Sequence, residues 1–156
     1  MNRPRTPHRQ RGFLIIAAVF LLVVLAGLVA YLMTVSTTSQ AASAADFNSA
    51  RAYQAARAGA EWGVYEILRD PVGGTYKPAC DGGAANKNLT FGSALAAYTA
   101  TVACTSVSLT EGAGTVRAYR IVSNACNVPT GGGACPNAAA TSTTYVEREV
   151  GLSITK

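Results

Sequence analysis

The residues that could carry out chemistry are few in this sequence, and they lack the spacing that catalysis needs. The cysteines are Cys80, Cys104, Cys126 and Cys135, and the single histidine is His8. The sequence contains no Cys-X-X-Cys pair, which argues against a thiol oxidoreductase and against a zinc site. Beyond residue 8 no histidine is available for a Ser/His/Asp or Cys/His arrangement. We therefore expect no enzymatic activity, no metal and no cofactor.

Other polar or aromatic groups have simpler explanations than a reactive site. Glu147 and Glu149 fall on one face of a predicted strand, as an acid–base pair would, but a soluble surface explains them as well. The glycine-rich stretch TGGGAC (130–135) lacks the Gly-Lys-Ser/Thr of a phosphate loop. Aromatic residues of this region could form a carbohydrate-binding surface, although such residues more often fill a sheet core. They are Phe91, Tyr98, Tyr119 and Tyr145.

An even number of cysteines favours two disulfides in a compartment that permits oxidation. A hairpin turn at residues 111–114 would place Cys104 opposite Ile121, so that a bridge from Cys104 to Cys126 would be strained. We favour the pairs Cys80–Cys104 and Cys126–Cys135, although the sequence alone allows three pairings.

The formal net charge of +5 comes mainly from the first residues of the chain. Arg3, Arg5, Arg9 and Arg11 precede the first acidic residue, Asp46, and the remainder of the chain is nearly neutral. A nucleic-acid binder needs clustered Lys and Arg on a folded face. The charge is therefore interpreted as a signal for the orientation of the chain in a membrane, and no nucleic-acid partner is expected.

A long apolar run follows these arginines. Residues 13–33 carry no charge, which matches the roughly 20 residues of a transmembrane helix and exceeds the about 7–15 of a secretory signal. The stretch SQAASAA (39–45) resembles a signal cleavage site, but it does not directly follow the run. Arginines on the amino-terminal side predict that this end lies in the cytoplasm and the rest outside.

The absence of proline between Pro7 and Pro71 predicts one very long helix. Residues 13–34 would form its transmembrane part, and residues 35–70 its periplasmic continuation. An apolar stripe at helical spacing predicts a packed face in the second part, with Leu68 also able to enter a core. The stripe consists of Tyr53, Ala56, Ala60, Val64 and Ile67.

Residues 71–156 are predicted to form an antiparallel β head with disulfides. Alternating segments favour strands over residues 94–109, 115–126 and 143–156, in a sheet of three or four strands. The fold class is therefore α+β: a long amino-terminal helix packed on a small antiparallel sheet. Residues 1–12 remain as a basic leader.

Two stretches resemble the type IV pilin family. The first, RQRGF (9–13), is similar to a prepilin leader, and the second, ARAYQAARAGAEWGVYEIL (50–68), is similar to the helix of minor, pilin-like assembly proteins. The nearest resemblance is to MshP-type proteins of mannose-sensitive haemagglutinin pili, and then to PilX-like minor pilins. This resemblance implies a pilin-like fold in which the apolar helix is first a membrane anchor and later the stem of a filament.

The resemblance also implies processing and partners. A prepilin peptidase would cleave after Gly12 and methylate the new amino terminus at Phe13. The other partners would be pilin-like subunits and the lipid of the bacterial inner membrane, with the head in the periplasm.

One position departs from the family. Major pilins carry a glutamate at the fifth mature position, and this chain has Ala17 there. The departure implies either a place at the filament tip or a role in assembly from within the inner membrane. A single-pass anchored binding module of the periplasm is the alternative function.

Overall fold

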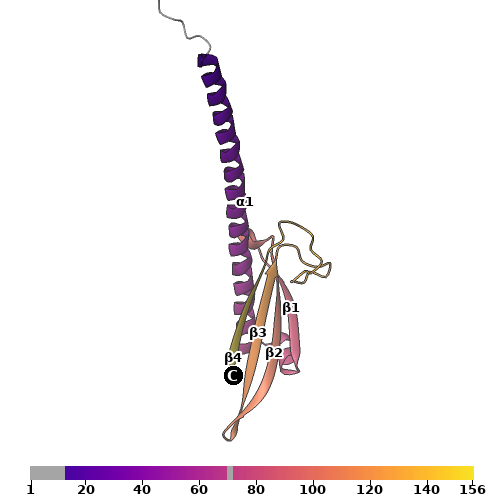
Figure 1. Ribbon diagram of the computed structural model, residues 1–156. Helices are drawn as coiled ribbons and strands as arrows, with labels where there is room; N and C mark the ends of the chain where they lie inside the picture. The colour runs from indigo at the N-terminus through magenta and orange to yellow at the C-terminus, as the bar shows by residue number, and fades with distance from the viewer. Residues whose placement is uncertain (1–12, 70–71) are drawn as a thin grey trace, which may run out of the picture. The chain divides into compact units, whose positions relative to one another are not determined.

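The computed structural model describes residues 13–69 and 72–156 and has the predicted α+β architecture (Figure 1). A long amino-terminal helix precedes a four-stranded antiparallel sheet, an arrangement consistent with a pilin-like fold. The elements are α1 (Phe13–Arg69), α2 (Tyr76–Asp81), β1 (Ala84–Thr90), the 3-10 helix η1 (Ser93–Leu95), β2 (Thr99–Glu111), β3 (Gly114–Cys126) and β4 (Glu147–Thr155).

The chain divides into two compact units, Met1–Ser43 and Ala44–Lys156. In the first unit, the described residues are entirely helical and belong to α1. Their sequence contains no charge or proline up to Ser43, so nothing interrupts the intrahelical hydrogen bonds. The second unit, called the head below, contains the rest of α1 and all the strands.

The sheet of the head has the strand order β1-β2-β3-β4, and every neighbouring pair is antiparallel (Figure 1). The turn between β2 and β3 consists of Gly112 and Ala113, since Glu111 pairs with Gly114. Gly112 has φ +60°, which glycine adopts without strain at the first position of a type II′ turn. The predicted turn at residues 111–114 is confirmed.

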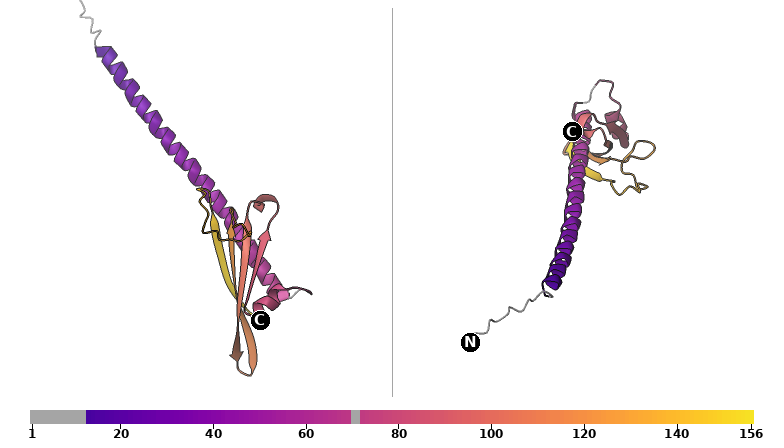
Figure 2. Two further views of the ribbon diagram at one scale, coloured as in Figure 1. Left: turned by 90° about the vertical axis from the view of Figure 1, so that its right-hand side faces the viewer. Right: turned by 90° about the horizontal axis from the view of Figure 1, so that it is seen from above.

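The last part of α1 lies across one face of the sheet (Figure 2). Its buried stripe is made of small residues together with one bulky one at its end. A Cβ on Gly63 would lie 2.9 Å from Ile121 Cγ2 and 3.0 Å from Val102 Cγ1, so only glycine permits this close approach. The stripe comprises Ala52, Ala55, Ala56, Gly59, Ala60, Gly63 and Ile67.

The predicted stripe was therefore partly wrong. Tyr53 is 46% exposed, and Leu68 is equally exposed, whereas Val64 packs only partly against the core. Ala56, Ala60 and Ile67 are buried as predicted, whereas Tyr53 and Val64 were assigned to the buried face on apolar character alone. The helix packs on the sheet through its stripe of small residues, which lets the two backbones approach closely. This face is rotated about the helix axis from the predicted one.

The predicted strands also need correction. Residues 94–98 contain the end of η1 and a turn rather than the start of a strand, and β4 begins at Glu147 rather than at residue 143. The short helix α2 and the strand β1 were not predicted. The sequence of β1, AANKNLT, is mostly polar with weak alternation, because one of its faces and its outer edge are exposed.

Candidate functional site

The apolar part of α1 is the first candidate functional region. The helix is long and apolar enough to cross a membrane, a test that some signal sequences also pass. Its large side chains point outward on every side, with exposures from 43% at Val24 to 72% at Leu14. An apolar surface of this extent needs lipid or protein around it.

Processing is expected between Gly12 and Phe13. Gly12 falls outside the described residues, so the predicted cleavage position stays a prediction. Phe13 is the first residue of α1, and Ala17 is exposed one turn further along. A Cβ on Gly27 would meet nothing within 4 Å, so this part of the helix has room for a closely packed neighbour.

The first disulfide joins Cys80 in α2 to Cys104 in β2, with Cα atoms 5.6 Å apart. Both cysteines are almost completely buried, and they lie in a core cluster with Ile67, Val102 and Ile121. The bridge fixes α2 to the sheet. In the register of the hairpin, Cys104 pairs with Ile121, as the predicted turn required.

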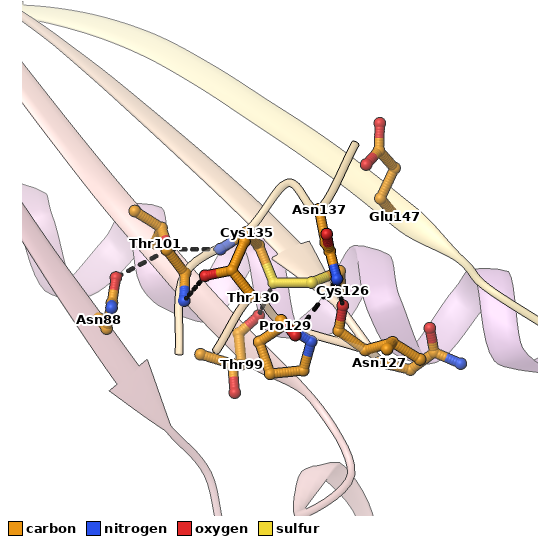
Figure 3. Close-up of a disulfide and its surroundings, with 12 residues drawn as sticks. Asn88, Thr99, Thr101, Cys126, Asn127, Pro129, Thr130, Cys135, Asn137 and Glu147 are labelled. Atoms are coloured by element: carbon orange, nitrogen blue, oxygen red, sulfur yellow. Dashed lines mark hydrogen bonds between the residues drawn. A yellow bond between two sulfur atoms is a disulfide. The ribbon is translucent and has the colours of Figure 1, made fainter. Parts of the chain in front are cut away.

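The second disulfide joins Cys126 to Cys135, which closes part of the loop between β3 and β4 (Figure 3). The Cys135 amide donates to Thr101 Oγ1 at 2.8 Å, and that hydroxyl donates to Asn88 Oδ1 at 2.8 Å. Thr101 lies on the opposite face of β2 from the buried Ala100 and Val102, so the loop covers the face that α1 leaves free. Both disulfides have the pairing that the sequence favoured.

A cluster of charges holds α2 against β3. The Asp81 carboxylate accepts hydrogen bonds from Lys77 Nζ at 3.0 Å and from Tyr119 Oη at 2.8 Å. Arg117 Nη1 donates to the Asp81 carbonyl and lies 3.4 Å from its carboxylate. Desolvation opposes ionisation, but these hydrogen bonds and the charges of Lys77 and Arg117 outweigh it and lower the pKa of Asp81.

The carboxyl end of α1 is closed by Lys156. Its Nζ donates to the carbonyls of Ile67 and Leu68, both at 3.0 Å. A cation at this end satisfies carbonyls that lack an intrahelical partner and interacts favourably with the helix dipole. The end of the helix and the end of β4 are thereby joined.

A groove with a volume of about 450 Å³ lies between α1, α2 and β1. We call it the β1 groove. Trp62 and Tyr76 meet there edge to face, with ring centroids 4.8 Å apart. Glu66 and Lys87 contribute opposite charges to its lining. Burial, and then the charge of Glu66, raise the pKa of Tyr76 to about 12. The remaining lining residues are Gly73, Gly74, Thr75, Ala79, Ala84, Ala85 and Asn86.

The structure does not bring the other sequence-predicted candidates together. Glu147 and Glu149 are exposed, and Glu147 Oε2 accepts a hydrogen bond from Tyr145 Oη at 2.6 Å. Tyr98 and Tyr119 are buried core residues, so the four aromatics do not form a carbohydrate-binding surface. Among residues 13–69 and 72–156, no group of three or more His, Cys, Asp or Glu could hold a metal ion.

Sequence reasoning missed the β1 groove. The one available signal was Trp62, the only tryptophan of the chain. Tyr76 follows it after the segment DPVGG (70–74). Without α2 and β1 in the prediction, nothing indicated that these rings would meet.

Comparisons of the chain with protein-family models, with curated proteins and with solved structures found no match.

Proposed function

We propose that this chain is a minor pilin-like subunit of a type IV pilus or a related secretion filament, which initiates or caps assembly. The observation that carries the proposal is the double use of α1. One helix, Phe13–Arg69, supplies a segment with apolar side chains exposed all round and also the stripe of small residues buried against the sheet. A protein that needed only an anchor could join it to the head by a linker.

In this function, the apolar segment is a lipid anchor before assembly. The segment then leaves the lipid and bundles with the equivalent segments of other subunits, while the head forms the outer surface. Small residues allow close helix approach without an apolar driving force. In the exposed segment they are Ala17, Ala18, Ala26, Gly27 and Ala30.

Ala17 determines which version of this function is favoured. A carboxylate buried among apolar stems needs a cationic partner. An alanine at this position needs no such partner and also loses the ion pair that the carboxylate would form. A subunit without this carboxylate suits the filament tip, because there it does not have to form an ion pair with an earlier subunit. Alternatively, it assists assembly from the inner membrane without entering the fibre.

The proposed topology has the arginine-rich end in the cytoplasm and the head in the periplasm. The leading arginines support this orientation through the positive-inside rule. Two disulfides, with no free cysteine among the described residues, support an oxidising compartment for the head.

The test is the intact mass and amino-terminal sequence of the protein isolated from its native membrane. A chain beginning with methylated Phe13 is expected. A chain that retains Arg3 to Arg11 would refute prepilin processing and favour an anchored binding module, whereas a start near Ala45 would indicate a secretory signal. As a control, Gly12→Val should retain the leader under the same conditions.

The alternative function is a periplasmic binding module held by a single-pass anchor. The β1 groove favours it, because an open groove lined by two aromatic rings is a feature that binding requires and filament packing does not.

A further inference from the structure

The β1 groove runs beside a free edge of the sheet. We propose that it binds an extended peptide segment of a partner protein, which adds to the sheet as a strand next to β1. This inference does not rest on the proposed function, since a strand-binding edge could serve a filament subunit or an anchored module equally well.

The edge provides the backbone half of the site. β1 is the first strand in the sheet order and pairs only with β2. Alternate N–H and C=O groups of such a strand point away from the sheet. Within the described part of the chain, no backbone group pairs with them on that side. They are arranged to bind the backbone of an incoming strand.

The two edges of the sheet differ in how they are protected. β4 begins with Glu147, Arg148 and Glu149, and charges of this kind discourage pairing at an edge. β1 contains a single charge, Lys87, and no proline. β1 is therefore the edge more open to strand addition.

The groove provides the side-chain half of the site. Ala84 to Lys87 form one wall, so a strand paired with β1 would direct alternate side chains toward the groove. Trp62 is half-buried and Tyr76 is buried, which leaves an aromatic surface in contact with the open volume. The space suits one bulky apolar side chain with its neighbours.

The charged residues of the groove indicate which side chains should flank the central residue of the partner segment. Glu66 and Lys87 line the groove, and neither forms an ion pair with any residue that the structure describes. A segment with a basic side chain near Glu66 and an acidic one near Lys87 would satisfy both. The preferred occupant is thus an extended segment with a central aromatic or aliphatic residue between opposite charges.

Trp62 gives a direct readout, because it is the only tryptophan in the chain. The experiment titrates the full chain in detergent with the blocked heptapeptide Thr-Lys-Thr-Phe-Thr-Glu-Thr and with its charge-reversed form Thr-Glu-Thr-Phe-Thr-Lys-Thr. Lys, Phe and Glu share one face of either peptide when it is extended. We expect saturable change in Trp62 emission and a preference for one of the two charge orders.

Backbone methylation tests strand addition itself. Two versions of the preferred peptide carry N-methyl groups on the odd or on the even amides. Since only one edge of the peptide would pair with β1, one version should bind about tenfold more weakly than the other, corresponding to a loss of one or two hydrogen bonds. Equal binding of both versions would overturn strand addition.

Side-chain variants test the groove. The pair of changes Glu66→Gln and Lys87→Gln should remove the charge-order preference and weaken binding about threefold. Glu61→Gln is the matched control: Glu61 is an exposed acid of the same helix, paired with Arg57, and its loss should leave binding unchanged. Replacing Phe by Ala in the peptide should weaken binding about tenfold or more.

Three outcomes would overturn the proposal. The first is the absence of a saturable response to either peptide. The second is a response to a neutral oligosaccharide such as maltohexaose when both peptides are inert. The third is a change in Trp62 emission on raising the protein concentration alone, which would identify a second copy as the occupant.

Discussion

The two parts of α1 differ in what they bury: residues 14–36 bury no side chain, whereas the part from Ala52 to Ile67 buries a face made mainly of small residues. From Leu14 to Val35, large aliphatic and aromatic side chains are exposed around the helix. From Ala52 to Ile67, the buried residues are mainly alanine and glycine, whereas the bulky Tyr53 and Tyr65 are exposed. Hydrophobicity alone therefore does not decide which face of this helix is buried.

The difference follows from the two environments that the helix has to fit. A lipid bilayer, which the apolar part is long enough to cross, would accept bulky side chains on every side because it is fluid. A sheet offers a fixed surface, and the helix approaches it only where side chains are small. A Cβ on Gly59 would lie 3.1 Å from both Ala100 Cβ and Val102 Cγ2 and closer still to Ser123 Oγ.

The largest expected effect tests the apolar part. Val23→Asp places a carboxylate near the middle of the uncharged run, and insertion of such a residue into a bilayer costs about 2.5–3.5 kcal/mol. We expect a large loss of protein from the membrane fraction after alkaline extraction. Leu68→Asp, which introduces the same charge at an exposed site of the head, should leave the membrane fraction unchanged. An equal loss of both variants from the membrane fraction would show that the two parts of α1 do not differ in their response to an added charge.

The next effect tests the buried stripe. Gly59→Val forces the helix away from β2 and should lower the free energy of unfolding of the head by about 1–3 kcal/mol. Urea unfolding of the full chain in detergent, followed by Trp62 fluorescence, measures the change. Gly27→Val is the matched control, because a Cβ there meets nothing within 4 Å. Similar destabilisation by both changes would contradict packing on the sheet as the cause of the loss.

A smaller effect concerns the charges that hold α2. The pKa of Asp81 is lowered in the folded head, so its contribution is present above the ordinary carboxyl pKa of about 3.9 and is lost as the pH falls through the lower folded value. Asp81→Asn should destabilise the head by about 1 kcal/mol at neutral pH and reduce the loss of stability between neutral and acid pH. Asp46→Asn, which removes a carboxylate from an exposed position of α1, is the matched control and should leave the free energy of unfolding at neutral pH unchanged.

The smallest effect concerns a polar atom in the helix–sheet interface. Ser123 is completely buried, and its Oγ has no hydrogen-bond partner among the residues that the structure describes. A buried hydroxyl without a partner is destabilising. Ser123→Ala should therefore leave the free energy of unfolding unchanged or raise it by up to about 1 kcal/mol. A clear decrease, in the same urea experiment, would show that the hydroxyl makes a stabilising contact with α1.

Much of the architecture could be predicted from local sequence signals. The absence of proline predicted α1, and alternation predicted a strand over residues 115–126, where β3 lies. Both signals are strong because burial on a sheet face has a period of two residues and a helix without proline keeps its hydrogen bonds. The hairpin turn then provided the register that separates Cys104 from Cys126.

The candidate binding site was much less accessible to sequence reasoning. The β1 groove is formed by three segments, each of which contributes a weak or ambiguous pattern. Trp62 looked like one more residue of a helix, α2 is only six residues long, and β1 is mostly polar. Their juxtaposition depends on the Cys80–Cys104 bridge and on the side of the sheet that α1 covers.

The sequence by itself determined the long helix, its apolar first part, the oxidised cysteines and the antiparallel character of the head. Each of these depends on a composition or a period that neighbouring residues carry along the chain. The tertiary structure alone decided the rotation of α1 on the sheet and the position of the free edge at β1. It also decided that Trp62 and Tyr76 lie together. These features depend on how closely two backbones can approach, and that distance is set by residues far apart in the sequence, such as Gly63 and Ile121.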